Sequence, residues 1–129
     1  MHTSRALLDL SPSLSHAGKF EDFKVLGALL ELDIGYCKRI DCKNALEVLP
    51  TMPWAAQIQK LRLTDTDAEG KFEDFKVLGA LLELDIRYCK KIDCKYALEV
   101  LPTMPWSAQI QKLRLSGTDA EGTTGTFFF

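Results

Sequence analysis

Four cysteines are the residues of this 129-residue chain that first suggest chemistry. They form two C-x4-C pairs, Cys37 with Cys42 and Cys89 with Cys94, and thiolates are both nucleophiles and metal ligands. A zinc site is one interpretation of these pairs, and disulfides are another. The spacing is loose for zinc, however, and neither histidine of the chain lies nearby. We therefore expect reduced, buried thiols that bind no metal or other cofactor.

Carboxylate pairs are the second candidate for chemistry. Glu31 and Asp33, like Glu83 and Asp85, stand two residues apart, so in a strand both would project from one face. A general acid/base pair is one interpretation. Basic residues recur beside them, which favours a charge-compensated, solvated face instead. Since both histidines precede residue 18, the repeated part of the chain contains no Ser/His/Asp or Cys/His arrangement, and we expect a non-catalytic protein.

The chain is an internal duplication. Residues 18–69 form a first copy and residues 70–121 a second, each of 52 residues. The copies differ at six positions: Gly35/Arg87, Arg39/Lys91, Asn44/Tyr96, Ala55/Ser107, Thr64/Ser116 and Asp65/Gly117. A repeated surface of this kind favours binding over catalysis, because an active site is usually one asymmetric set of residues. We therefore expect a repeat architecture.

Each copy contains two shorter repeats. The first reads Leu29-x-x-Leu32-x-Ile34-x-x-Cys37-x-x-Ile40 and then Ile58-x-x-Leu61-x-Leu63-x-x-Thr66, and the second copy repeats both. Leu8, Leu32, Leu61, Leu84 and Leu113 are separated by 24, 29, 23 and 29 residues. This pattern resembles the leucine-rich repeat, with alternating long and short units as in the ribonuclease-inhibitor type and cysteines as in the cysteine-containing type.

The resemblance implies an α/β leucine-rich-repeat solenoid of about five units. Short parallel strands centred near Asp9, Asp33, Arg62, Asp85 and Arg114 would form its concave face, with helices and turns on the convex face. In the long units, Asp41 would cap a helix over residues 42–49 that Pro50 ends. In the short units, the helix would bury the apolar residues at helical spacing: Phe72, Phe75, Leu78 and Leu82. Trp54 and Trp106 would pack over the long-unit helices.

The ends of the chain depart from this pattern. Residues 1–17 read as a degenerate first repeat, residues 18–121 as the array and residues 122–129 as a tail without repeat character. Neither end resembles a cap, so we expect a fragment of a longer array, with a truncated gene model as the alternative. An uncapped C-terminal end would leave the sheet edge at residues 113–116 open as a surface for self-association.

Charged side chains between the buried leucines form two rows when the units are placed in register. One row reads Glu31, Lys60, Glu83, Lys112, and the next reads Asp9, Asp33, Arg62, Asp85, Arg114. Alternating signs predict a protein partner of mixed charge. We expect contact through these rows and their tyrosine flank, at Glu31, Asp33, Tyr36, Lys60, Arg62, Glu83, Asp85, Arg87, Tyr88, Lys112 and Arg114.

Composition narrows the class of partner. A net charge of −2 and a pI of about 5.7 argue against nucleic acid, which normally meets a basic face. No secretory signal or membrane-spanning apolar run is evident, so we expect a cytoplasmic protein, with the nucleus as the alternative. Residues 32–41 and 84–93 also resemble the substrate-recognition repeats of F-box-type ubiquitin-ligase subunits, which is a narrower hypothesis. A cysteine-metal-dependent enzyme is the alternative of a different class.

Overall fold

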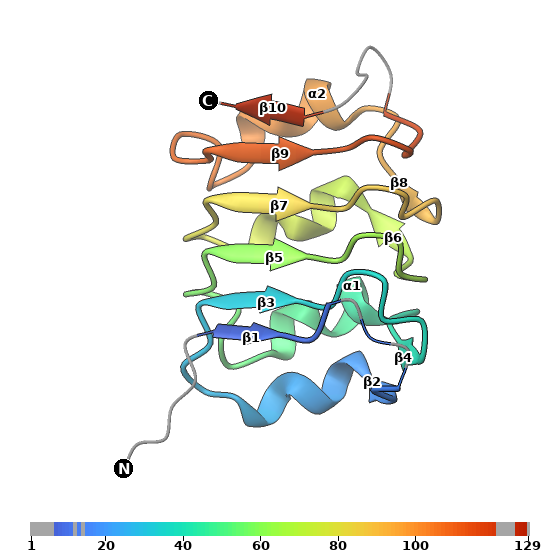
Figure 1. Cartoon of the computed structure of the whole chain (residues 1–129). Coiled ribbons are helices and arrows are strands. Elements are labelled where there is room, and N and C mark those ends of the chain that lie inside the picture. The colour runs from blue at the N-terminus through green and yellow to red at the C-terminus, as the bar shows by residue number, and fades with distance from the viewer. Residues whose placement is uncertain (1–6, 12, 14, 121–125, 129) are drawn as a thin grey trace.

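The fold is built on a sheet of six short strands, which the computed structural model describes within residues 7–11, 13, 15–120 and 126–128. The strands lie in the order β1-β3-β5-β7-β9-β10 (Figure 1). Their bounds are β1 (Leu7–Asp9), β3 (Glu31–Asp33), β5 (Lys60–Arg62), β7 (Glu83–Asp85), β9 (Lys112–Arg114) and β10 (Thr126–Phe128). The helical segments lie behind this sheet, on one of its faces.

The first five strands are parallel, as the leucine spacing predicts. Leu8 pairs in register with Leu32, and the pairing continues through Leu61 and Leu84 to Leu113. Each of these leucines is the central residue of a three-residue strand, so each strand is centred one residue before the predicted position. The α/β class and the five-stranded parallel sheet are therefore confirmed.

β10 corrects the expected open edge. It pairs antiparallel with β9, with Thr126 opposite Arg114 and Phe128 opposite Lys112. The edge expected to be free at residues 113–116 is thus paired along Lys112–Arg114, because Thr126–Phe128 lies antiparallel beside the last repeated strand. This pairing covers the backbone edge of β9 and makes β10 the terminal strand of the sheet.

The short crossovers contain 3₁₀ helices, η1 (Phe20–Val25) and η3 (Phe72–Val77). Phe72, Phe75 and Leu78 are all buried at a spacing of three residues, which is the period of a 3₁₀ helix. Leu82, expected on the same helix, lies beyond it and is only partly buried. The Asp74 carboxylate accepts the Lys71 N–H at 2.9 Å and so satisfies a free donor at the start of η3.

The long crossovers hold much shorter α-helices than predicted. They are α1 (Ala45–Val48), followed by the 3₁₀ helix η2 (Leu49–Thr51), and α2 (Ala97–Val100), followed by η4 (Leu101–Thr103). Asp41 does not cap a helix. It lies in β4 (Ile40–Asp41) and accepts the Lys43 N–H at 3.0 Å. The Cys42 N–H is bound to the Asp67 carboxylate at 2.8 Å, so residues 42–44 form a turn instead of a first helical turn.

Two small parallel sheets, each of two strands, form where the crossovers begin. β2 (Gly18–Lys19) pairs with β4, and β6 (Gly70–Lys71) pairs with β8 (Ile92–Asp93). They place the beginning of each short crossover beside the beginning of the next long one. The sequence pattern does not predict them, because each is only two residues long.

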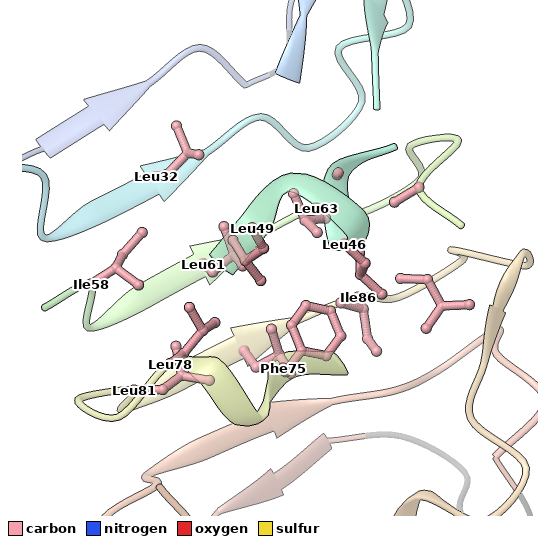
Figure 2. Close-up of a cluster of buried hydrophobic side chains, with 14 of the residues drawn as sticks. Leu32, Leu46, Leu49, Ile58, Leu61, Leu63, Phe75, Leu78, Leu81 and Ile86 are labelled. Carbon is pink, nitrogen blue, oxygen red and sulfur yellow. The ribbon is translucent and has the colours of Figure 1, made fainter. Parts of the chain in front are cut away.

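The core fills the space between the sheet and the helical segments. Figure 2 shows Leu32, Leu61, Leu63 and Ile86 from the sheet side meeting Leu46, Leu49 and Phe75 from α1, η2 and η3. Trp54 and Trp106 are fully buried, as expected of packing residues, and their Nε1–H groups donate to the Phe23 and Phe75 carbonyls at 2.9 Å. The strands' other face therefore turns away from the core.

Candidate functional site

The outer sheet face is the face of the sheet opposite the core, and it presents both predicted charge rows. Register places Glu31 beside Lys60, then Glu83 and Lys112, and places Asp33 beside Arg62, then Asp85 and Arg114. Strands in a sheet lie about 4.8 Å apart, so these neighbours interact. The structure thus brings together eight of the eleven sequence-predicted site residues on one face.

Arg62 joins the two rows. Its Nε–H donates to Glu83 Oε2 at 2.8 Å, and its Nη1 lies 3.4 Å from Asp33 Oδ2. The hydrogen bond to Glu83, opposed by burial, raises the pKa of Arg62 above its ordinary value. Lys60 adds a longer pair to Glu31, at 3.8 Å. The first copy is therefore connected to the second by charge as well as by backbone pairing.

Asp85, at the end of β7, lies close to two arginines. Arg87 Nε and Nη2 donate to its two carboxylate oxygens at 2.9 and 2.8 Å, a bidentate arrangement. Arg114 Nη1 lies 3.7 Å from Asp85 Oδ2. The hydrogen bonds to Asp85 are the largest cause of a raised pKa at Arg87. Arg87 is thus held in a fixed orientation on the outer sheet face.

Two of the carboxylates expected to be solvated are in fact buried. Glu83 is 5% exposed and Asp85 is 1% exposed. Burial alone would raise the pKa of Glu83, but the hydrogen bond and charge of Arg62, with Lys112 and Lys60, outweigh it and hold that pKa below its ordinary value. The solvated-face interpretation is therefore wrong at these two residues, because basic side chains pair with the carboxylates there.

Tyr36 and Tyr88 mark the edge of the outer sheet face. They are 40% and 45% exposed, and each has a left-handed backbone, with φ of 60° and 62°. Their N–H groups donate to the Thr64 and Ser116 carbonyls at 2.7 and 2.9 Å, so this conformation continues the backbone pairing past the strand. Bulky residues rarely adopt it. The two tyrosines follow strands that are not neighbours, β3 and β7, with β5 between them.

The cysteines belong to the core. All four are buried and free of disulfides. Cys37 and Cys89 donate to the Leu10 and Leu63 carbonyls at 3.3 and 2.9 Å. Burial raises the pKa of Cys42 and of Cys94 to about 12, and the charges of Asp67 and Asp119 add to the effect. Within the described residues, no three His, Cys, Asp or Glu side chains cluster as a metal site would require.

One contrast between the copies escapes sequence reasoning. Lys38 Nζ lies 2.7 Å from Asp65 Oδ2 and 3.2 Å from the Asp65 carbonyl oxygen. In the second copy the equivalent residues are Lys90 and Gly117, so that carboxylate is missing. The Asp65/Gly117 difference is visible in the sequence, but its meaning depends on the Lys38–Asp65 pair, which only the structure reveals.

Comparisons with protein-family models, curated proteins and solved structures gave no match for this chain. Among the described residues, no helix combines the length and apolar character needed to cross a bilayer.

Proposed function

We propose that this chain is a leucine-rich-repeat module without catalytic activity that binds a protein through its outer sheet face. In this proposal the parallel strands line the concave side of a solenoid and the helical segments form its convex side. The repeated leucine pattern, the 24-29-23-29 spacing and the regular strand register support it. Five stacked strands bring a set of polar side chains together on one surface, as repeat arrays used for binding do.

The observation that carries the binding role is the pair of exposed, left-handed tyrosines. Non-glycine residues held in this region persist only where the surroundings enforce it, and they cluster at functional sites. Tyr36 and Tyr88 keep their rings about half exposed, so burial does not fully account for their presence. Tyrosine and arginine are enriched at interface hot spots, and Arg87 lies directly before Tyr88.

Charge on the outer sheet face supports a protein partner of mixed charge. From β3 onward opposite signs alternate in both rows, so the face offers no continuous positive field for a nucleic acid. Substrate recognition for an F-box-type ubiquitin ligase is a narrower form of the same proposal, supported only by the resemblance of residues 32–41 and 84–93. The buried thiols with raised pKa values lend no support to a cysteine-metal enzyme.

The test is capture of the partner followed by mapping of the contact. The purified chain is used as bait in a cell extract, and the binding constant of the identified protein is measured by calorimetry. Tyr88→Ala should weaken binding about tenfold or more, as loss of an interface anchor does. Leu98→Ala, on the exposed side of α2, is the control and should bind like the parent chain.

Urea melts of both variants exclude unfolding as the cause. Loss of binding in Leu98→Ala together with full binding in Tyr88→Ala would place the contact on the helical side and overturn the proposal.

A further inference from the structure

The two copies carry different charge at the ends of their strands. The Gly35/Arg87 difference adds a positive charge in the second copy, and the Asp65/Gly117 difference removes a negative one. The strand ends of the second copy are therefore more positive by two charges. Residues 35 and 87 directly precede Tyr36 and Tyr88, and residues 65 and 117 lie opposite these tyrosines. Both differences therefore change the surroundings of the tyrosine ring.

The loss of Asp65's counterpart leaves the Lys90 ammonium without the partner that Lys38 has. Lys38 is paired with Asp65 at 2.7 Å. For Lys90, no ion pair is found within the part of the chain that the structure describes, since Gly117 offers no carboxylate. An ammonium without a counter-ion at a protein surface attracts an anionic group.

Gly117 also determines where the Tyr88 ring lies. A Cβ placed on Gly117 would collide with that ring, so the ring packs directly over the glycine. Tyr88 and Lys90 line a hollow of about 330 Å³ together with Lys38, Lys91 and Asp65. Its buried lining includes Cys37 and Ile40. Tyr88 and Lys90 thus border the same space.

Two of the other charges around the hollow are already paired. Lys38 is held by Asp65, and Lys91 lies 3.6 Å from the Glu69 carboxylate. The Asp67 carboxylate accepts the Cys42 N–H at 2.8 Å. Arg87, on the strand side of Tyr88, is oriented by Asp85. Lys90 is therefore the charge that a ligand in this hollow would neutralise.

We propose that this hollow binds an acidic side chain, aspartate or glutamate, of the protein partner. The proposal rests on the proposed function and adds to it the chemistry of the anchor: the carboxylate meets Lys90, and its peptide lies against the Tyr88 ring. Of the three lysines that line the hollow, Lys90 alone has no ion pair within the described residues, and one ammonium fits one carboxylate. On a chain of net charge −2 it does not create the field that a polyanion requires.

The test uses a defined probe, the blocked hexapeptide Gly-Glu-Gly-Glu-Gly-Glu, titrated into the full isotope-labelled chain at low ionic strength. Backbone amide signals of residues 88–91 should shift, and the isosteric glutamine peptide should bind about tenfold more weakly. Shifts of equal size with the glutamine peptide would overturn the proposal. A phosphoserine peptide is the third arm, and binding of that peptide alone would replace the carboxylate with a phosphate.

Exchanging residues between the copies provides matched variants. Gly117→Asp restores the first copy's carboxylate beside Lys90 and also displaces the Tyr88 ring that packs over the glycine, so the affinity for the glutamate peptide should fall about fivefold or more. Asp65→Gly removes the ion-pair partner of Lys38 and so leaves its ammonium free to bind a ligand in the hollow. The affinity for the glutamate peptide should then rise about two- to fivefold. Lys90→Gln removes the ammonium without a change at Gly117 and should weaken binding about fivefold, which keeps the proposal testable if Gly117→Asp folds poorly.

Exposed residues away from the hollow serve as charge controls. Lys24→Gln and Glu47→Gln change the net charge by one unit and should leave the affinity for the peptide within twofold. If Lys24→Gln weakens binding as much as Lys90→Gln does, the peptide responds only to overall charge and the site is wrong. If Lys90→Gln has no effect while Tyr88→Ala still abolishes binding of the captured partner, the carboxylate anchor fails and the proposed function stands.

Discussion

The residue that follows each of the last four parallel strands by three positions has a left-handed backbone. These residues are Tyr36, Asp65, Tyr88 and Gly117. Only Gly117 adopts this region without a steric penalty, which is about 1–2 kcal/mol for other residues. The chain nevertheless keeps tyrosine in two of the four places. Their retention is a stability cost that a binding role would explain.

Substitution of Tyr36 should reverse the usual order of alanine and glycine. Tyr36→Ala loses the ring and keeps the strained backbone, whereas Tyr36→Gly loses the ring and relieves the strain. We expect the glycine variant to be more stable than the alanine variant by about 1 kcal/mol in urea melts. An alanine variant at least as stable as the glycine variant would show that the left-handed backbone is not strained.

Glu83 should make stability depend on pH. Its pKa lies below the ordinary value of 4.5 in the folded chain, although burial opposes this, because Arg62 stabilises the charged form. A lowered folded-state pKa contributes stability that is complete above the unfolded-state pKa and is lost as pH falls through the folded-state pKa. Urea melts between pH 6 and about pH 3 should show a smaller loss of stability in Glu83→Gln than in the parent chain. Equal losses would show that Glu83 is not paired in solution.

At the scale of elements, the five parallel strands depend on a column of leucines. Leu84 in β7 is fully buried between its neighbours Leu61 and Leu113, whereas Leu7 in β1 is 54% exposed. Each strand is only three residues long and forms few hydrogen bonds of its own. Burial of the central leucine is therefore the main local reason for each strand to form.

Leu84→Ala should destabilise the chain by about 2–5 kcal/mol, because it removes buried methyl groups and leaves a cavity. Leu7→Ala is the matched control and should change stability by less than about 1 kcal/mol. The free energies of unfolding come from urea melts of both variants. Similar losses in the two would mean that the assignment of inner and outer residues is wrong.

Removal of residues 122–129 should expose the backbone edge of β9. β10 now pairs with Lys112–Arg114, and an unpaired edge strand recruits another chain. We expect sedimentation velocity to show concentration-dependent association of the truncated chain, with the full chain as control. A truncated chain that stays monomeric at every concentration would show that β10 does not protect this edge.

Strand positions and register could be predicted because a repeated leucine at a regular interval leaves little choice. The crossovers could not be predicted as well. Asp41 before an apolar segment looks like a helix cap, but its carboxylate and that of Asp67 instead bind the N–H groups of a turn. The spacing of Phe72, Phe75 and Leu78 fits both an α-helix and a 3₁₀ helix, and the structure has the latter. β10 has no repeat pattern to reveal it.

The sequence predicted which residues of the candidate site lie side by side, but not which of them are buried, strained or paired. The rows of charges follow directly from register. The burial of Asp85 does not, because it depends on Arg87 turning back onto the carboxylate two residues earlier. The strained backbone of Tyr88, and the lack of an ion pair at Lys90 among the residues that the structure describes, depend on contacts across strands that a single sequence does not contain.

At the scale of the whole molecule, all four thiols report on opening of the core. Burial raises the pKa of Cys42 and Cys94 to about 12, and it also raises the pKa values of Cys37 and Cys89. Thiolates are therefore scarce in the folded chain near pH 8, and a thiol reagent must wait for opening.

Labelling with a disulfide reagent at pH 8 should be at least about a hundredfold slower in the native chain than in guanidinium, with Cys42 and Cys94 modified last. Mass spectrometry of the labelled peptides gives the order. Rapid modification of all four cysteines in the native chain would show that the thiols are accessible, and would reopen the metal-site interpretation.

The seam between the two copies has one further consequence. It joins β5 (Lys-Leu-Arg) to β7 (Glu-Leu-Asp), and the same two tripeptides recur as β9 and β3. β9 of one molecule therefore matches β3 of another as well as β5 matches β7 within the chain. Such a head-to-tail contact is heterologous, so its repetition gives a ring if the rotation closes and a filament if it does not. β1 occupies the edge of β3 and β10 that of β9. Two terminal strands of three residues each thus occupy the two sheet edges that such a contact would need.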